Sequence, residues 1–418
     1  MKPRFNSWRR RRAAIGSTLV LLLSMAGARA DVVSDWNATA QGVFLAKGAN
    51  AGVYFAMMHI AIYDAVNAID GRYTVFAVKP TSDARGASKE AAAAAAAYNT
   101  LLNLFPDQQT TLQNAYVASL ARVPDGAAKT RGIKIGEEVS AAWLASRVGD
   151  GREAVIPYVF GTEPGDYQRT PPAFPNPAPV WFATVKPFAL TSPSQFRAYG
   201  PPDLTSWRYA QDVNTVKELG SLNSTKRTAE QTEIAMFHTE NPTTYWAHNI
   251  RDLVATRPLS VEDSARFFAM VFVGYGDAAI ACFDSKYHFN RWRPVTAIVN
   301  ADADGNDATA ADSAWLPLAN TPAHPEYPAA HGCVSAAVAD TLKRFFGPRN
   351  FQFTMTSSVA NTKPHVYRST DEFINEVMMA RVWGGMHFPT STVHGAAIGH
   401  HVAAWVEDNY FRKVKNRK

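Results

Sequence analysis

The chain has 418 residues, of which 47% are hydrophobic, so it can bury a large core as one large domain or two. Its two cysteines exclude a disulfide-rich scaffold. The formal net charge of +6 would suggest nucleic-acid binding, but seven of the 42 basic residues lie in residues 1–30, which contain no acid. The rest of the chain carries 35 basic and 36 acidic residues, and we expect no nucleic-acid partner.

Residues 1–30 have the features of a signal peptide. Arg9–Arg12 form a basic segment, Ala13–Ala28 form a short apolar run interrupted by Gly and Ser, and Ala28-Arg29-Ala30 is a cleavage site. The arginine run is also a loose match for the twin-arginine route. No later run of 18 or more apolar residues is apparent. We therefore expect cleavage after Ala30 and a periplasmic or secreted protein without an integral membrane segment.

Helices are predicted from residue 35 to residue 148. Residues 53–69 place apolar side chains at three- and four-residue steps, and residues 89–105 include seven consecutive alanines, which are strong helix formers. Two further helices are expected at 108–123 and 127–148. His59 and Asp64 are interpreted as polar groups satisfied in the core, with a catalytic role as the alternative.

Residues 157–202 are predicted to form a long loop without helices. They contain 11 of the 25 prolines, which interrupt helices, and several aromatic residues that favour a packed loop. This loop is either a lid over a ligand site or a linker between domains.

Helices resume after this loop. Capping-box patterns begin at Thr228, Ser260 and Ser369, and Ser391 is expected to cap a last helix that runs to about Tyr410. The other expected helices cover residues 207–220, 228–239, 261–289 and 366–386. Residues 351–356 alternate like a strand. Because strand content is minimal, the predicted fold is all-α and built from helical bundles, with a first region at 31–205 and a second at 206–418.

Three short cationic segments lie in the second region. They are Lys286 to Pro294, Pro328 to His331, and Arg381 to His387. Lys286 and Arg293 share a face on a continuous helix, and His331 stands near a helix start, where free N–H groups favour an anion. Arg381 and His387 can meet at one ligand only if the helix bends or ends at Gly384-Gly385. Guanidinium and ammonium groups suit phosphate-like oxygens, so these segments predict an oxyanion site.

The three segments resemble the signature of vanadium-dependent haloperoxidases and phosphatidic-acid-phosphatase-type acid phosphatases. That signature reads K-x6-R-P, P-S-G-H and (S)R-x5-H. The resemblance implies two packed helical bundles, with the oxyanion in the later one. In the haloperoxidases it implies that Lys286, Arg293 and Arg381 bind the oxygens of one vanadate per chain, that His387 is the vanadium ligand, and that His331 is the acid–base residue.

The resemblance also implies the chemistry. A halide would be oxidised by hydrogen peroxide, with His331 moving protons and Lys286 polarising the peroxide. In the phosphatases, His387 would instead be the nucleophile and His331 the leaving-group acid, with phosphate bound as the substrate and no cofactor. A non-catalytic oxyanion-binding protein is the third interpretation. The oligomeric state and the organic substrate stay open.

This chain departs from the signature at three positions. Ala329 replaces the Ser whose hydroxyl donates to the oxyanion, a hydrogen bond of about 1.5–3 kcal/mol. Ala330 replaces the Gly, and its N–H can still donate if the backbone is helical there. Ser391 stands where the phosphatases have an acid that orients the His, so His387 is expected to lack a carboxylate partner, which counts against phosphoryl transfer.

The remaining candidates are peripheral. His324 occupies the place of a His in algal bromoperoxidases, which favours bromide or iodide over chloride, with a solvent-facing loop residue as the alternative. Arg291 is expected outside the site. Cys282 and Cys333 flank two of the motifs and either pair or stay separate. Four other histidines are expected at helix surfaces or in packing, and not in a metal cluster: His288, His394, His400 and His401.

Overall fold

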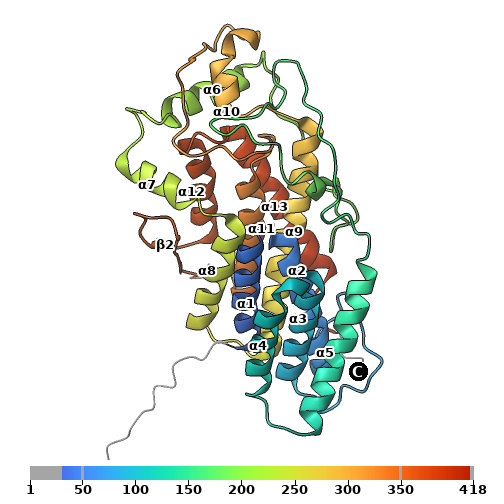
Figure 1. The fold of residues 1–418 in the computed structure, drawn as a ribbon. Coiled ribbons are helices and arrows are strands. Elements are labelled where there is room, and N and C mark those ends of the chain that lie inside the picture. The colour runs from blue at the N-terminus through green and yellow to red at the C-terminus, as the bar shows by residue number, and fades with distance from the viewer. Residues whose placement is uncertain (1–30, 49–50, 348–350, 415–418) are drawn as a thin grey trace, which may run out of the picture.

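The computed structural model describes residues 31–48, 51–347 and 351–414, and it is an all-α protein of packed helical bundles, as predicted (Figure 1). The expected signal peptide at residues 1–30 lies outside the described residues. The one sheet among the described residues is an antiparallel pair, β1 (Phe353–Met355) and β2 (His365–Tyr367).

The N-terminal region supplies one bundle. Its core is made by α2, α3 and α5, which pack on one another, while α1 and α4 pack against α3. The alanine run of α3 is completely buried, and Gly136 of α5 lies so close to the Ala92 backbone that a side chain there would clash. The elements are α1 (Val32–Lys47), α2 (Ala51–Asp70), α3 (Lys89–Leu104), a 3-10 turn η1 (Pro106–Gln108), α4 (Gln109–Leu120) and α5 (Ala127–Ser146).

The later region supplies the second bundle and the helices around it. Helices α9, α11, α12 and α13 pack together, and α6, α7, α8 and α10 lie beside them (Figure 1). The elements are η2 (Val180–Thr184), α6 (Trp207–Leu219), α7 (Ala229–Phe237), α8 (Pro242–Thr256), α9 (Val261–Phe289), α10 (Pro294–Val299), η3 (Ala301–Ala303), α11 (Ala330–Phe346), α12 (Thr370–Trp383) and α13 (Pro389–Asn409).

Helix α9 joins the two bundles, because it contacts α2 as well as α11 and α13. Residues 267–283 of this helix are all buried, so other elements surround it on every side. By length and composition α9 and residues 52–70 of α2 are candidate membrane spans, although 94% and 89% of these segments are buried inside the protein. Both therefore serve as core helices here.

Two buried aspartates anchor loops to the core in the same way. Asp64 of α2 accepts hydrogen bonds from the three consecutive N–H groups of residues 76–78, each at 2.8 Å. Asp277 of α9 accepts from those of residues 188–190 at 2.7–2.9 Å. The interpretation of Asp64 as a satisfied core polar residue agrees with this contact. His59 is also buried and its Nε2 lies 2.9 Å from Asn37 Nδ2, but its Nδ1 has no partner among the described residues, so it is satisfied at one ring nitrogen only. Asp277 fixes part of the proline-rich loop on α9.

Several predicted boundaries were wrong. The helix expected at 366–386 begins at Thr370, because residues 365–367 pair with β1. The last helix begins at Pro389, and Ser391 lies inside it and does not cap it. Residues 180–184 of the proline-rich loop form a 3-10 helix, which was not expected. Of the three capping patterns, the complete reciprocal box occurs at Thr228.

Glycines bring α11 and α13 into close contact. A Cβ on Gly399 would lie 2.2 Å from the Cys333 carbonyl oxygen, and one on Gly395 would lie 2.5 Å from that of Ala329. This close approach places the start of α11 beside the start of α13.

Candidate oxyanion site

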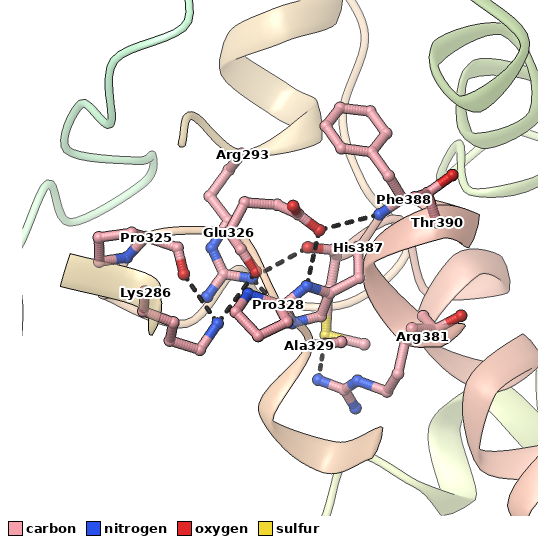
Figure 2. A network of polar contacts seen from close by, with 12 residues as sticks. Lys286, Arg293, Pro325, Glu326, Pro328, Ala329, Arg381, His387, Phe388 and Thr390 are labelled. Atoms are coloured by element: carbon pink, nitrogen blue, oxygen red, sulfur yellow. Dashed lines mark hydrogen bonds and ion pairs between the residues drawn. The ribbon is translucent and has the colours of Figure 1, made fainter. Parts of the chain in front are cut away.

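Residues of the three cationic segments predicted from the sequence lie close together (Figure 2). Four of the side chains lie at the start or the end of a helix, and His387 lies between two helices. Lys286 lies in the last turn of α9, Arg293 caps the start of α10, His331 is in the first turn of α11, Arg381 is in the last turn of α12, and His387 lies between α12 and α13. The helix carrying Arg381 ends at Trp383, three residues before the predicted bound at 386. It therefore ends before Gly384-Gly385, as the meeting of Arg381 and His387 at one ligand requires.

Lys286 is completely buried at the edge of this group. Its ammonium donates to the carbonyl oxygens of Pro325 and Glu326, both at 2.9 Å. An ammonium has three donors, so these two bonds orient the third. Burial lowers the pKa of Lys286, and Arg293 nearby lowers it further.

Arg293 lies at the centre of the group and is also fully buried. Its guanidinium donates to the carbonyl oxygens of His324 and Met386 at 2.8 and 2.9 Å. It also contacts two imidazoles, His324 Nδ1 at 2.9 Å and His387 Nε2 at 3.1 Å. A guanidinium can only donate, so both ring nitrogens accept from it. His324 Nδ1 also lies 3.3 Å from the Pro325 carbonyl, but the shorter contact with Arg293 favours the tautomer with its proton on Nε2.

The other ring nitrogen of His387 is held by a carboxylate. Its Nδ1 lies 2.8 Å from Glu326 Oε1, which also accepts the N–H of Phe388 at 3.0 Å (Figure 2). Nδ1 therefore carries the proton, and Nε2 presents a lone pair toward Arg293. Burial raises the pKa of Glu326 to about 7, although Lys286 and Arg293 act in the opposite direction.

Arg381 is buried, and few of its hydrogen-bond donors have a good acceptor in the described part of the chain. One terminal nitrogen donates to the His238 carbonyl at 2.7 Å, and the other contacts the Met386 sulfur at 3.0 Å, a weak acceptor. Its buried Nε has no hydrogen-bond partner among the described residues. Desolvation lowers the pKa of Arg381 to about 9, and Arg293 contributes in the same direction. Such a side chain is ready to bind a stronger acceptor.

His331 lies at the helix start expected from Pro328. Helix α11 begins at Ala330, so the N–H groups of its first turn lack partners within the helix, and the donor role of Ala330 stays a prediction. The buried Nε2 of His331 has no partner among the described residues. His331, His324 and Arg381 line a cavity of about 600 Å³, together with apolar residues that include Phe182 of the proline-rich loop.

The electrostatic environment keeps the imidazoles neutral. Burial lowers the pKa of His387, His331 and His324 well below the ordinary value, and the surrounding cations lower it further. Near the three buried cations lie two buried carboxylates, Glu326, which is hydrogen-bonded to His387, and Glu240, which lines the cavity. Burying such an excess of positive charge is costly unless an anion compensates it.

Glu326 is the site residue that the sequence analysis missed. The expectation that His387 lacks a carboxylate was wrong, because Glu326 takes that place from a different segment. Ser391 lies beside the same carboxyl, but its buried hydroxyl makes no hydrogen bond of normal geometry within the described residues. Glu326 belongs to no motif. The feature of the sequence that could have indicated it is its place between two cationic segments, directly after Pro325.

The structure also shows where the other candidate residues lie. His324 touches Arg293 and lines the cavity, so the solvent-facing alternative was wrong. Arg291 is outside the group and donates to the Pro202 carbonyl at 2.6 Å. Cys282 and Cys333 are buried free thiols that do not form a disulfide, and they donate to the carbonyls of Pro328 and Ala329 at 3.7 and 3.4 Å.

The residues present fit a tetrahedral oxyanion such as vanadate. Arg381 has an orphaned buried N–H, Lys286 has an oriented third donor, and the Nε2 lone pair of His387 is fixed by its Nδ1 contact. An imidazole held in this way is the usual form of a metal-ligating histidine.

Two comparisons with known sequences agree on the family that this chain resembles. The model of the VCPO second helical-bundle domain matches residues 266–416. Vanadium chloroperoxidase of Curvularia inaequalis is 28% identical over 214 residues, which are 41% of this chain and 33% of the relative. The match thus spans about a third of that relative's length.

Solved structures share the fold over most of the chain. A bacterial vanadium-dependent iodoperoxidase superposes with a TM-score of 0.79 at 22% identity, covering 93% of this chain and 98% of the other. A holo-type bacterial vanadium-dependent chloroperoxidase gives 0.66 at 16% identity, covering 86% and 91%.

Proposed function

Because this chain belongs to the superfamily of vanadium-dependent haloperoxidases and phosphatidic-acid-phosphatase-type acid phosphatases, we propose that it is a vanadate-binding haloperoxidase. Its substrates would be hydrogen peroxide and a halide, with bromide or iodide favoured. It would act in the periplasm or outside the cell, as residues 1–30 suggest. The observation that carries the proposal is the group of three buried cations, Lys286, Arg293 and Arg381, around the Nε2 lone pair of His387.

The cations and His387 would bind the cofactor. Arg293 and Arg381 would donate to oxyanion oxygens, and Lys286 would direct its third N–H to a bound oxygen. His387 would supply Nε2 as the ligand atom, since Nδ1 is committed to Glu326. Vanadate(V) would contribute a Lewis acid that keeps its oxidation state.

His331 would move protons in this site. It is neutral because burial lowers its pKa, and its Nε2 is free of protein partners among the described residues, so it can accept a proton from hydrogen peroxide. His324, with Nε2–H as its remaining donor, would offer a hydrogen bond to a halide in the cavity.

The experiment is vanadate loading of the purified protein followed by metal analysis and a bromide and iodide oxidation assay. We expect one vanadium per chain and activity with peroxide, both lost in His387→Ala. The exposed His401 on α13 gives the control variant His401→Ala, which should keep both. Loaded protein that oxidises neither halide would contradict the proposal.

A phosphatase is the second candidate, and the Glu326–His387 contact favours it. A histidine nucleophile needs its other nitrogen held by a carboxylate, and Glu326 provides this. Vanadate-free protein that hydrolyses an aryl phosphate and accumulates phosphohistidine at His387 would support this candidate. Oxyanion binding without turnover in either assay would indicate a non-catalytic binding protein.

A further inference from the structure

A second cluster of ligand-type side chains lies outside the oxyanion site. His238 ends α7, His365 lies in β2, and Glu376 lies on α12. His238 Nε2 and His365 Nδ1 are 3.0 and 2.8 Å from the same oxygen, Oε1 of Glu376. One donor atom from each residue lies within 4.8 Å of the other two.

The surroundings of His365 resemble those of a metal ligand. Its Nε2 lies 2.9 Å from Oε2 of Glu233, so a carboxylate holds the ring nitrogen that faces away from the cluster. Metal-ligating histidines usually donate their other N–H to a carboxylate in this way, which turns the lone pair toward the metal. Phe237 stacks on the His365 ring at 4.0 Å between centroids and fixes its orientation.

The charges in the cluster also favour a bound cation. Without a metal, His365 can donate to both carboxylates only if both of its ring nitrogens carry a proton. Within the cluster two carboxylates then face one positive charge, and the next cation, Arg381, contacts the backbone carbonyl of His238 and neither carboxylate. A divalent ion with two neutral imidazoles would balance the two carboxylates and convert hydrogen-bonded donors into ligands.

We propose that His238, His365 and Glu376 bind a divalent transition-metal ion of the zinc class, at a structural centre separate from the oxyanion site. Two imidazoles and one carboxylate form a donor set suited to such an ion. The Tyr367 hydroxyl, 2.5 Å from Glu376 Oε1, orients the carboxylate.

The centre connects three elements next to the oxyanion site. It links the end of α7, the hairpin strand β2 and helix α12, which also carries Arg381. The His238 carbonyl accepts from Arg381 at 2.7 Å, so an ion on the His238 ring would fix the residue that anchors this guanidinium. The role of the ion would be to hold these elements together, independent of any reaction at His387.

The test uses the full chain, freed of metal with a chelator and free of vanadate. Zn²⁺ binding is measured by calorimetry and by melting temperature, and Co²⁺ is added as a spectroscopic probe. We expect one ion per chain, a tetrahedral-type Co²⁺ spectrum that Zn²⁺ displaces, and a melting temperature that rises with Zn²⁺. Wild-type protein that binds neither ion would overturn the proposal.

Variants locate the site. Glu376→Gln and His365→Ala should each weaken Zn²⁺ binding at least tenfold and remove the Co²⁺ spectrum, an effect of about 1.4 kcal/mol or more. His400→Gln is the matched control, since His400 also pairs with one carboxylate, Asp340, at 2.7 Å. Binding that persists in Glu376→Gln would overturn the assignment even if His365→Ala fails to fold.

Discussion

The Nδ1 of His387 and Oε1 of Glu326 are 2.8 Å apart, and each side chain is only 1% exposed. The contact joins a residue of the third cationic segment to one that lies 61 positions earlier, beside the second segment. It determines which nitrogen of His387 carries the proton and leaves Nε2 as the ligand atom.

Replacing Glu326 should therefore weaken oxyanion binding. In Glu326→Gln the side chain keeps an oxygen for the N–H groups but loses the charge, and we expect a 10- to 100-fold rise in the vanadate Kd. Equilibrium dialysis with vanadate measures this. Glu230→Gln, on the exposed first turn of α7, is the control and should leave the Kd unchanged.

A rescue variant tests the placement of the carboxylate more sharply. Ser391 lies beside the Glu326 carboxyl, so Glu326→Ala combined with Ser391→Asp should recover vanadate affinity relative to Glu326→Ala alone. No recovery in a folded double variant would show that an acid at residue 391 cannot reach His387.

Ala329→Ser should strengthen the site. The residue is buried and caps α11 without a side-chain hydrogen bond, so a hydroxyl there would meet either the oxyanion or the first N–H groups of the helix. A new bond to the anion would lower the vanadate Kd about tenfold or more. Ala339→Ser, about 15 Å further along α11, is the control. Unchanged Kd with a higher melting temperature would indicate capping alone.

Acid should destabilise the vanadate-free protein. Burial and the nearby cations depress the pKa of His324 in the folded state, whereas in the unfolded chain it titrates near 6.5. Below about pH 6.5 the unfolded chain binds more protons, so the free energy of unfolding falls as pH falls. The stabilisation that neutral His324 gives is complete above about pH 6.5. It decreases as the pH falls toward the lower pKa of His324 in the folded state.

The His324→Gln variant isolates the contribution of His324 to this pH dependence. Glutamine keeps an acceptor for Arg293 but does not titrate, so its unfolding free energy should fall less steeply below about pH 6.5, by at most ~1.4 kcal/mol per pH unit. Urea denaturation at about pH 7.5 and about pH 5.5 measures the slopes. Parallel slopes for His324→Gln and wild type would contradict the assignment.

Gly399→Ala should destabilise the fold. A Cβ there would lie 2.2 Å from the Cys333 carbonyl, so α13 would have to move away from α11, at a cost of about 1–3 kcal/mol. Gly42→Ala is the control, because Gly42 in α1 is exposed with nothing within 4 Å, and it should stabilise by up to ~1 kcal/mol. Thermal unfolding compares the two, and equal melting temperatures would argue against the close contact.

Features set by neighbouring residues were predictable from the sequence. The helix at 261–289 was predicted with the bounds observed, because its cap at Ser260, its apolar composition and its end are all local. The end of α12 before Gly384 and the start of α11 after Pro328 are local for the same reason, and they position Arg381 and His331.

The tertiary structure alone decided which distant side chains complete each site. Glu326 replaces the missing acid at Ser391 because α11 and α13 approach closely enough to bring two loops together. His238, His365 and Glu376 converge from three elements for the same reason. Contacts between residues far apart in the chain depend on how the helices pack, and the spacing of residues along the chain does not encode that packing in a readable form.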